Sequence, residues 1–113
     1  MERISRVNQL IKKELSQILL KEVDFPRDVL VTVTRVESSA NLYQAKVYIS
    51  VMPEEKSADV LGLLRELIYS LQQELNKRLK MRPIPRIQFV REKKTAEAGK
   101  IEELLEKIHQ KNG

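Results

Sequence analysis

Two neighbouring stretches decide the fold: Val29-Leu30-Val31-Thr32-Val33-Thr34-Arg35-Val36 and, a few residues later, Leu42-Tyr43-Gln44-Ala45-Lys46-Val47-Tyr48-Ile49-Ser50-Val51. The first is rich in β-branched residues and the second alternates between apolar and polar side chains, and both patterns are typical of β-strands. The segment between them contains two serines and an asparagine, which favour a turn. The sequence therefore predicts a β-hairpin with one face packed against a core. The side chains expected on that face are Tyr43, Ala45, Val47, Ile49 and Val51.

Helical patterns flank this hairpin. Over residues 3–22, apolar side chains recur every three or four positions, which predicts an amphipathic helix. The same spacing predicts a second helix over residues 57–80, with Ser57 as its N-cap. Pro83 then enforces an extended passage, and residues 87–90 are short and β-prone, so they are expected to form a third strand.

These elements define an α+β fold. A last helix is expected over residues 95–111, which gives the order α-β-β-α-β-α. The helical connection between the second and third strands requires a right-handed crossover, so the helices should cover one face of a three-stranded sheet in a two-layer arrangement. We expect a single domain over residues 1–113, in which residues 95–113 form a C-terminal helical extension.

The composition excludes most catalytic chemistry. The chain has no cysteine, one histidine and three glycines, which excludes a thiolate metal site, a Cys–His pair and a glycine-rich phosphate loop. We expect no enzyme activity, no cofactor and no metal. A magnesium-dependent nuclease stays open as an alternative because carboxylates pair at Glu54-Glu55 and Glu102-Glu103, although both pairs are expected on solvated surface. No stretch has the ~20 apolar residues of a membrane span, so we expect a cytoplasmic protein without membrane attachment.

Positive charge is concentrated in one segment. The chain has a formal net charge of +5. Residues 77–94 hold eight basic residues and one acid, a net charge of +7, so the rest of the chain carries −2. A helix dipole accounts for cations near the end of the second helix but not for those that flank the third strand. We expect a polyanion-binding surface made by Lys77, Arg78, Lys80, Arg82, Arg86, Arg91, Lys93 and Lys94.

The few aromatic residues indicate how a nucleic acid would be recognised. Phe89 and, by its alternation, Tyr43 are expected in the core rather than on a stacking surface. Phosphate contacts and shape should then dominate over base stacking. A large folded RNA fits this description better than a short single-stranded motif.

The chain resembles the ribosome-binding factor A family over nearly its whole length. The resemblance is carried, in order, by Arg3-x-x-Arg6-Val7-x-x-x-Ile11-x-x-Glu14-Leu15, Pro26-Arg27, Val31-Thr32-Val33-Thr34-x-Val36-Glu37-x-Ser39, Asn41-Leu42-x-x-Ala45-Lys46-Val47-Tyr48-Ile49-Ser50-Val51, Arg82-x-x-Pro85-x-Ile87-x-Phe89 and Gly99-x-Ile101-x-x-Leu104-Leu105. It implies a type II KH-like fold and binding to 16S rRNA of the free 30S ribosomal subunit. It also implies a role in late small-subunit maturation, rRNA 5′-end processing and growth in the cold, with release assisted by a maturation GTPase. The family matches at Arg3, Arg6 and Arg27 add these three as further RNA-binding candidates.

One departure from the family pattern carries a structural expectation. The Ala-x-Gly kink that this family places between two helices falls on Leu67-Ile68-Tyr69, which has neither residue. We therefore expect the helix over residues 57–80 to be less kinked and continuous through this point.

Two further expectations concern partners. No apolar stripe is clearly left uncovered, so the chain is expected to be a monomer. The alternative to direct RNA binding is a protein–protein interaction module that is recruited to the ribosome through a ribosomal protein.

Overall fold

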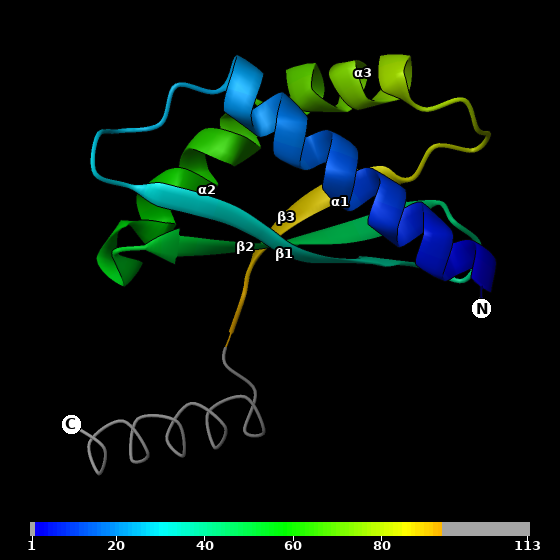
Figure 1. Ribbon diagram of the computed structural model, residues 1–113, viewed down its shortest axis with the longest axis horizontal. Helices are drawn as coiled ribbons and strands as arrows, with labels where there is room; N and C mark the ends of the chain where they lie inside the picture. The colour runs from blue at the N-terminus through cyan, green and yellow to red at the C-terminus, as the bar shows by residue number, and fades with distance from the viewer. Residues whose placement is uncertain (1, 94–113) are drawn as a thin grey trace, which may run out of the picture.

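The computed structural model describes residues 2–93 and shows a three-stranded sheet with its helices on one face (Figure 1). The elements are α1 (Glu2–Glu22), β1 (Leu30–Ser38), β2 (Gln44–Met52), the short 3-10 turn η1 (Glu54–Lys56), α2 (Ser57–Glu66), α3 (Ile68–Arg78) and β3 (Arg86–Arg91). The predicted two-layer α+β arrangement of the type II KH-like kind is confirmed. The helix predicted over residues 95–111 lies outside the described residues.

The sheet has the order β1-β2-β3, with β1 and β2 antiparallel and β2 and β3 parallel. The parallel pair follows from the crossover through α2 and α3. A register shift lies between Val33 and Arg35 in β1. This bulge explains how Val33 and Val36, an odd number of positions apart, can both be buried on the helical side.

The core lies between this sheet and the helices. Phe89 of β3 is 1% exposed, as predicted, and it belongs to the apolar cluster that forms the core. From α1 the core takes one stripe of side chains at helical spacing, and from β2 it takes every second side chain. The buried members of these two elements are Val7, Ile11, Leu15, Ile18, Leu19, Ala45, Val47, Ile49 and Val51.

The expectation of a continuous second helix was wrong. The helix is interrupted at Leu67, whose φ of −92° and ψ of 5° lie outside the helical range, so that α2 and α3 are separate elements. Each then meets a different neighbour, because α2 packs mainly on β3 whereas α3 packs mainly on α1. The half-buried Leu67 side chain packs against the core at the joint. Tertiary packing thus sets the break without the small residues that the family pattern uses.

Ser57 does not cap α2 through its side chain. It is the first residue of α2 and is 3% exposed, and no side chain caps this helix. The 3-10 turn η1 leads directly into the helix instead, with the Ser57 backbone N–H donating to the carbonyl oxygen of Glu54.

The prediction that Tyr43 belongs to the core was also wrong. Leu42 adopts a left-handed backbone conformation with φ of 60°, and its side chain is 5% exposed. This change of direction lets Leu42 occupy the core position and turns Tyr43 outward, where it is 63% exposed. β2 begins only at Gln44, so the alternation that holds along the strand does not extend back to Tyr43.

Candidate nucleic-acid interface

The described basic residues of the segment 77–94 fall into two groups rather than one surface. Lys77, Lys80, Arg82 and Arg86 lie at the end of α3, in the following loop and at the start of β3. Arg91 and Lys93 lie at and beyond the other end of β3, roughly 16 Å further along at the usual rise per residue. Lys94 lies outside the described residues.

The sheet register separates the two groups further. Arg86 pairs with Gln44, an exposed residue on the open face of the sheet. Arg91 pairs with Ile49, which is buried on the helical side. Since paired residues of neighbouring strands share a face, Arg86 and Arg91 leave the sheet on opposite sides. The single continuous surface expected from the sequence is therefore not formed.

Arg78 is held inside the fold. Its guanidinium group donates to Glu14 and to Gln17 of α1, at 3.2 Å in each case. The Arg78 and Glu14 side chains are only 26% and 19% exposed. This ion pair ties α3 to α1, so Arg78 contributes to packing more than to a binding surface.

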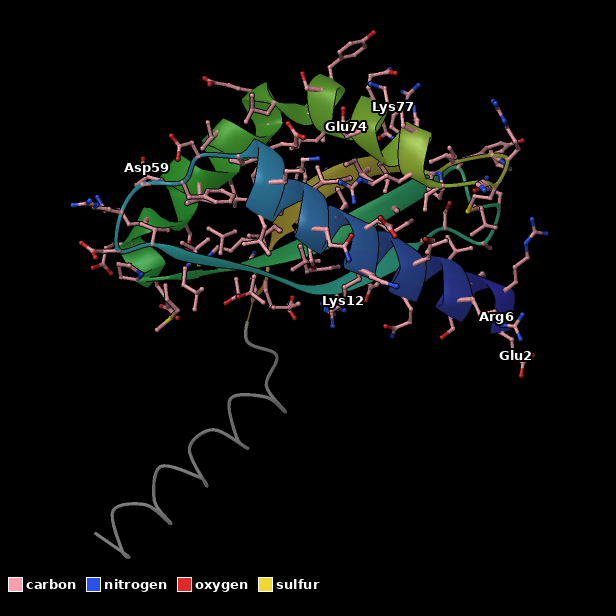
Figure 2. The ribbon with its side chains drawn as sticks, turned by 45° about the horizontal axis from the view of Figure 1, so that its top comes forward. Glu2, Arg6, Lys12, Asp59, Glu74 and Lys77 are labelled. Atoms are coloured by element: carbon pink, nitrogen blue, oxygen red, sulfur yellow. The ribbon has the colours of Figure 1, made fainter. Side chains whose placement is uncertain are left out.

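One end of the molecule gathers basic residues that are exposed. Figure 1 places the start of α1, the turn between β1 and β2 and the loop between α3 and β3 at this end. We call it the basic end and define it by Arg3, Arg6, Lys80, Arg82 and Arg86, all of them exposed. Figure 2 labels Arg6 there, with the acid Glu2 beside it in the first turn of α1.

The other basic candidates lie outside this end. Arg27 is exposed in the loop between α1 and β1, at the opposite end of the molecule (Figure 1). Lys77 is exposed on the last turn of α3, where its ammonium group lies 3.5 Å from the carboxylate of Glu74 (Figure 2). Exposed pairs of this kind contribute little to stability, so Lys77 stays accessible to a ligand.

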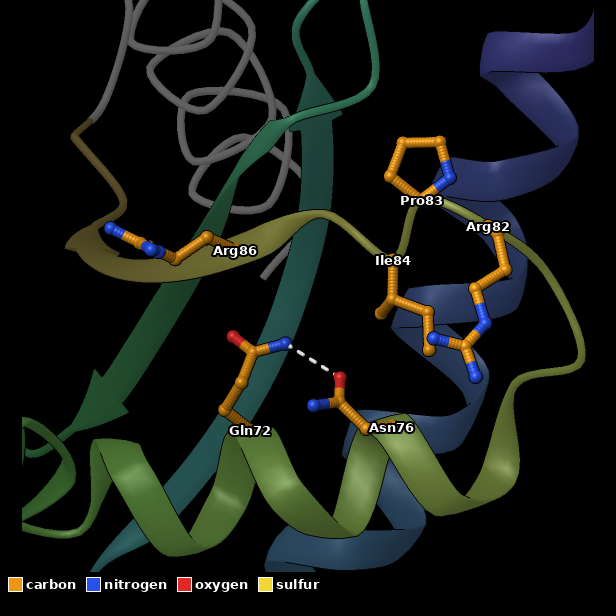
Figure 3. Close-up of a pocket in the computed structure, with 6 residues that line it drawn as sticks. All are labelled: Gln72, Asn76, Arg82, Pro83, Ile84 and Arg86. Atoms are coloured by element: carbon orange, nitrogen blue, oxygen red, sulfur yellow. Dashed lines mark hydrogen bonds between the residues drawn. The ribbon is translucent and has the colours of Figure 1, made fainter.

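A groove of about 620 Å³ opens at the basic end, between α3 and the start of β3 (Figure 3). Its lining consists of Gln72, Asn76, Arg82, Pro83, Ile84 and Arg86. Among residues 2–93, neither arginine forms a salt bridge, and the lining includes no acid. Two guanidinium groups without a carboxylate partner in the described part of the chain suit a phosphate ligand.

Gln72 fixes the shape of this groove. Its amide nitrogen donates to the carbonyl oxygen of Pro85 and to Asn76, both at 3.1 Å. Its amide oxygen accepts from the backbone N–H of Ile87 at 2.9 Å. Gln72 thus joins α3 to the strand that carries Arg86. Sequence reasoning missed Gln72 and Asn76, for which the one available signal was two amide residues four positions apart on a helix.

The middle of the open sheet face carries a different, self-contained cluster. Arg35 donates to Glu92 at 3.0 Å, pairs with Glu37 and lies 3.7 Å over the ring of Tyr48. The Tyr48 hydroxyl in turn donates to Glu37 at 3.1 Å. The hydrogen bond to Glu92 raises the pKa of Arg35, and burial together with the Glu37 hydrogen bond raises the pKa of Tyr48. With one cation and two carboxylates, this part of the sheet does not favour phosphate.

The described part of the chain shows neither a metal site nor a membrane-spanning helix. Residues 2–93 contain no group of three acidic or histidine side chains arranged to hold a metal ion. No helix within the same range is both long and apolar enough to cross a membrane.

Comparisons with known proteins agree on one family. The family model described as ribosome-binding factor A matches residues 3–105. The ribosome-binding factor A of Brevibacillus brevis is 43% identical over 108 residues, covering 94% of this chain and 88% of that protein. The one from Bdellovibrio bacteriovorus is 36% identical over 107 residues, covering 94% of this chain and 80% of that protein.

Solved structures give the same result. The crystal structure of ribosome-binding factor A from Thermus thermophilus superposes with a TM-score of 0.67 at 26% identity, covering 78% of this chain and 94% of that one. A Thermus thermophilus ribosome-binding factor A homology model, fitted into a cryo-EM map of its complex with the 30S subunit, gives a TM-score of 0.63 at 29% identity. It covers 74% of this chain and 88% of that one. On this agreement of sequence and fold, the chain belongs to the ribosome-binding factor A family.

Proposed function

We propose that this protein binds the 30S ribosomal subunit as a non-catalytic maturation factor and contacts 16S rRNA with its basic end. Family membership supports the subunit as partner, since the Thermus thermophilus relative has been placed in a 30S complex. The observation that carries the RNA contact is the groove in which Arg82 and Arg86 are exposed and form no salt bridge with any carboxylate of residues 2–93. Arg3, Arg6 and Lys80 extend the same charge around that end of the molecule.

The finer part of the proposal concerns when and where the protein acts. It acts as a single domain and a monomer in the cytoplasm, on free 30S subunits in late maturation, where it supports rRNA 5′-end processing and growth in the cold. A maturation GTPase assists its release. The resemblance to the family supports these statements. Arg91, Lys93 and Arg27 remain candidates for secondary phosphate contacts away from the basic end, and Lys94, which lies outside the described residues, remains a candidate from the sequence alone.

The salt dependence of binding tests the electrostatic core of this proposal. If the basic end neutralises four to six phosphates, log K falls with log salt concentration at a slope of roughly −3 to −5. Replacing Arg82 and Arg86 together with alanine should make the slope shallower by about 2. Co-sedimentation with purified 30S subunits on sucrose gradients at several salt concentrations measures both slopes.

A matched control separates local contacts from net charge. Lys21 in the last turn of α1 and Lys56 at the end of η1 are exposed, and Figure 1 shows that the end of α1 and the turn before α2 lie away from the basic end, so replacing both lysines with alanine removes the same charge elsewhere. This control should keep nearly the wild-type slope. A slope near zero for the wild-type protein, or equal slopes for the two double variants, would contradict RNA contact at the basic end.

One observation favours the alternative of recruitment through a ribosomal protein. A hollow of about 370 Å³ with a largely apolar lining lies between the end of α1 and the edge strand β1. Leu20 and Leu30 line it and are 86% and 64% exposed. Replacing both with serine should leave affinity for protein-free 16S rRNA unchanged. A loss of 30S binding in this variant, with rRNA binding intact, would favour the alternative.

Incubation with precursor 16S rRNA tests the remaining alternative, a nuclease. The purified protein should leave the RNA intact in the presence of magnesium. Cleavage that survives repeated purification of the protein would overturn the non-catalytic assignment.

A further inference from the structure

The groove at the basic end continues into a second hollow. Pro83, Ile84 and Arg86 line both, and the second hollow of about 320 Å³ adds Tyr43 and Gln44. The two hollows therefore adjoin at Pro83, Ile84 and Arg86, and the second one places the exposed Tyr43 next to Arg86. Pockets for small ligands have volumes of about 300–1,000 Å³, so a single nucleotide is a suitable size.

Hydrogen bonds hold this part of the surface in place. Gln72 uses its amide nitrogen and oxygen on Pro85, Asn76 and Ile87, which sets the distance between α3 and β3. The Arg86 backbone N–H donates to the carbonyl oxygen of Tyr43 at 2.8 Å and so joins the start of β3 to the β1–β2 turn. These hydrogen bonds fix the shape of the groove, and a site with a fixed shape lowers the entropic cost of binding.

Asn76 is left with a donor that faces outward. Its side-chain oxygen accepts the hydrogen bond from Gln72, and this contact orients the amide (Figure 3). The Asn76 nitrogen forms no hydrogen bond with any other residue among 2–93. An exposed amide donor in this position suits the carbonyl oxygen of a nucleobase.

The remaining lining supplies the other contacts that a nucleotide needs. The ring of Tyr43 offers a stacking surface, because its side chain is 63% exposed and its backbone oxygen is already bonded to Arg86. Arg82 and Arg86 offer guanidinium groups to the phosphates on either side of the base. A duplex hides its base faces, so this combination selects an unpaired nucleotide.

We propose that this groove binds one unpaired nucleotide of RNA, with its base stacked on Tyr43 and in reach of Asn76, and with its flanking phosphates on Arg82 and Arg86. The inference rests on the proposed function and deepens it, because it names the RNA conformation that the basic end selects. It also departs from the sequence-based expectation that phosphate contacts and shape dominate over base stacking, which depended on placing Tyr43 in the core.

The test uses the full chain and a single-stranded RNA pentanucleotide with 2-aminopurine at its centre. Fluorescence titration should give tighter binding than for the same strand annealed to its complement. Replacing Tyr43 with alanine should weaken binding on the order of tenfold, the size seen when a stacking aromatic is removed, while Tyr43→Phe should stay within about twofold. The salt slope should not change in either variant, because no charge is altered.

A second readout locates the ligand on the surface. In NMR titrations with the pentanucleotide, the Asn76 side-chain amide and the Ile84 methyl signals should shift first. Asn76→Asp should weaken binding, because it replaces a donor with a charged acceptor. Thermal unfolding of each variant checks that the fold is retained, which is expected because Tyr43 and Asn76 are exposed.

Several outcomes would overturn the proposal. Equal affinity for single strand and duplex, or wild-type affinity in Tyr43→Ala, excludes stacking in the groove. Competition by a short poly-glutamate peptide at similar concentration would show a general anion site that does not select nucleotides. If 30S co-sedimentation persists in any of these cases, the nucleotide site fails and the proposed function stands. If the wild-type protein binds neither the pentanucleotide nor the 30S subunit, both fail.

Discussion

Replacing Gln72 with leucine should lower the free energy of unfolding by about 2–3 kcal/mol. Gln72 is half-buried, and its amide satisfies two backbone groups outside its own helix, the carbonyl of Pro85 and the N–H of Ile87. Leucine has a similar size but can pair with neither group. Leaving a buried or half-buried backbone donor or acceptor without its hydrogen-bond partner costs about 1–3 kcal/mol. Because this site is partly exposed, the loss of each of the two hydrogen bonds should cost an amount near the lower end of that range.

Urea denaturation of the full chain measures this loss. With an m value of about 1.5 kcal/mol per molar urea, the midpoint should fall by about 1.3–2 M while m stays constant. Gln73→Leu is the matched control, because Gln73 is the neighbouring residue of α3 and makes no side-chain hydrogen bond among residues 2–93. The change in helix propensity is identical, so equal midpoints for the two variants would refute the role assigned to Gln72.

Three further predictions concern single residues. Gly62→Ala should stabilise the protein by about 0.5–1 kcal/mol, measured as a higher Tm, because an added Cβ in α2 would meet no atom within 4 Å; an unchanged or lower Tm would contradict this. Leu15→Ala should lower the free energy of unfolding in urea by about 2–5 kcal/mol, because Leu15 is fully buried. The control Leu20→Ala should lower it by less than about 0.5 kcal/mol, because Leu20 is 86% exposed. The pKa of Tyr48 is raised in the folded protein, so the neutral form of its hydroxyl stabilises the fold. This contribution to the free energy of unfolding is complete below pH 10, the ordinary pKa of tyrosine, and it is lost as pH rises through the raised pKa of the folded protein. The decrease in the free energy of unfolding above pH 10 should be smaller in Tyr48→Phe than in the wild-type protein. The difference in 295 nm absorbance between these two proteins should titrate above pH 10.

Local patterns were sufficient for most of the fold. Alternation along residues 44–52 and helical spacing along residues 2–22 reflect which side chains face the core, so both elements were found to within a residue or two. The bulge in β1 and the break at Leu67 leave no local signature. The apolar spacing runs on through Leu67, and the end of α2 is set by packing on β3, which is distant in sequence.

The candidate site was predicted less well than the fold, for the same physical reason. A run of basic residues in the sequence shows where charge is concentrated but not the direction in which each side chain points. The alternation along β3 places Arg86 and Arg91 on opposite faces of the sheet. Arg78 is neutralised by Glu14, 64 positions away, which no local pattern reveals. Tyr43 was misplaced because the left-handed conformation of Leu42 reverses the alternation at that point. Neither Gln72 nor Asn76 stands out in the sequence, since their importance comes from the strand that they face.

The bulge between Val33 and Arg35 also affects how copies of this protein behave at high concentration. β1 is an edge strand, and a regular edge offers a row of free backbone donors and acceptors to the strand of another molecule. The extra residue interrupts that regular spacing and increases the local twist, so a foreign strand cannot extend the ladder along the full length of β1. The same irregularity that lets Val33 and Val36 face the core therefore protects the β1 edge of the sheet against edge-to-edge aggregation.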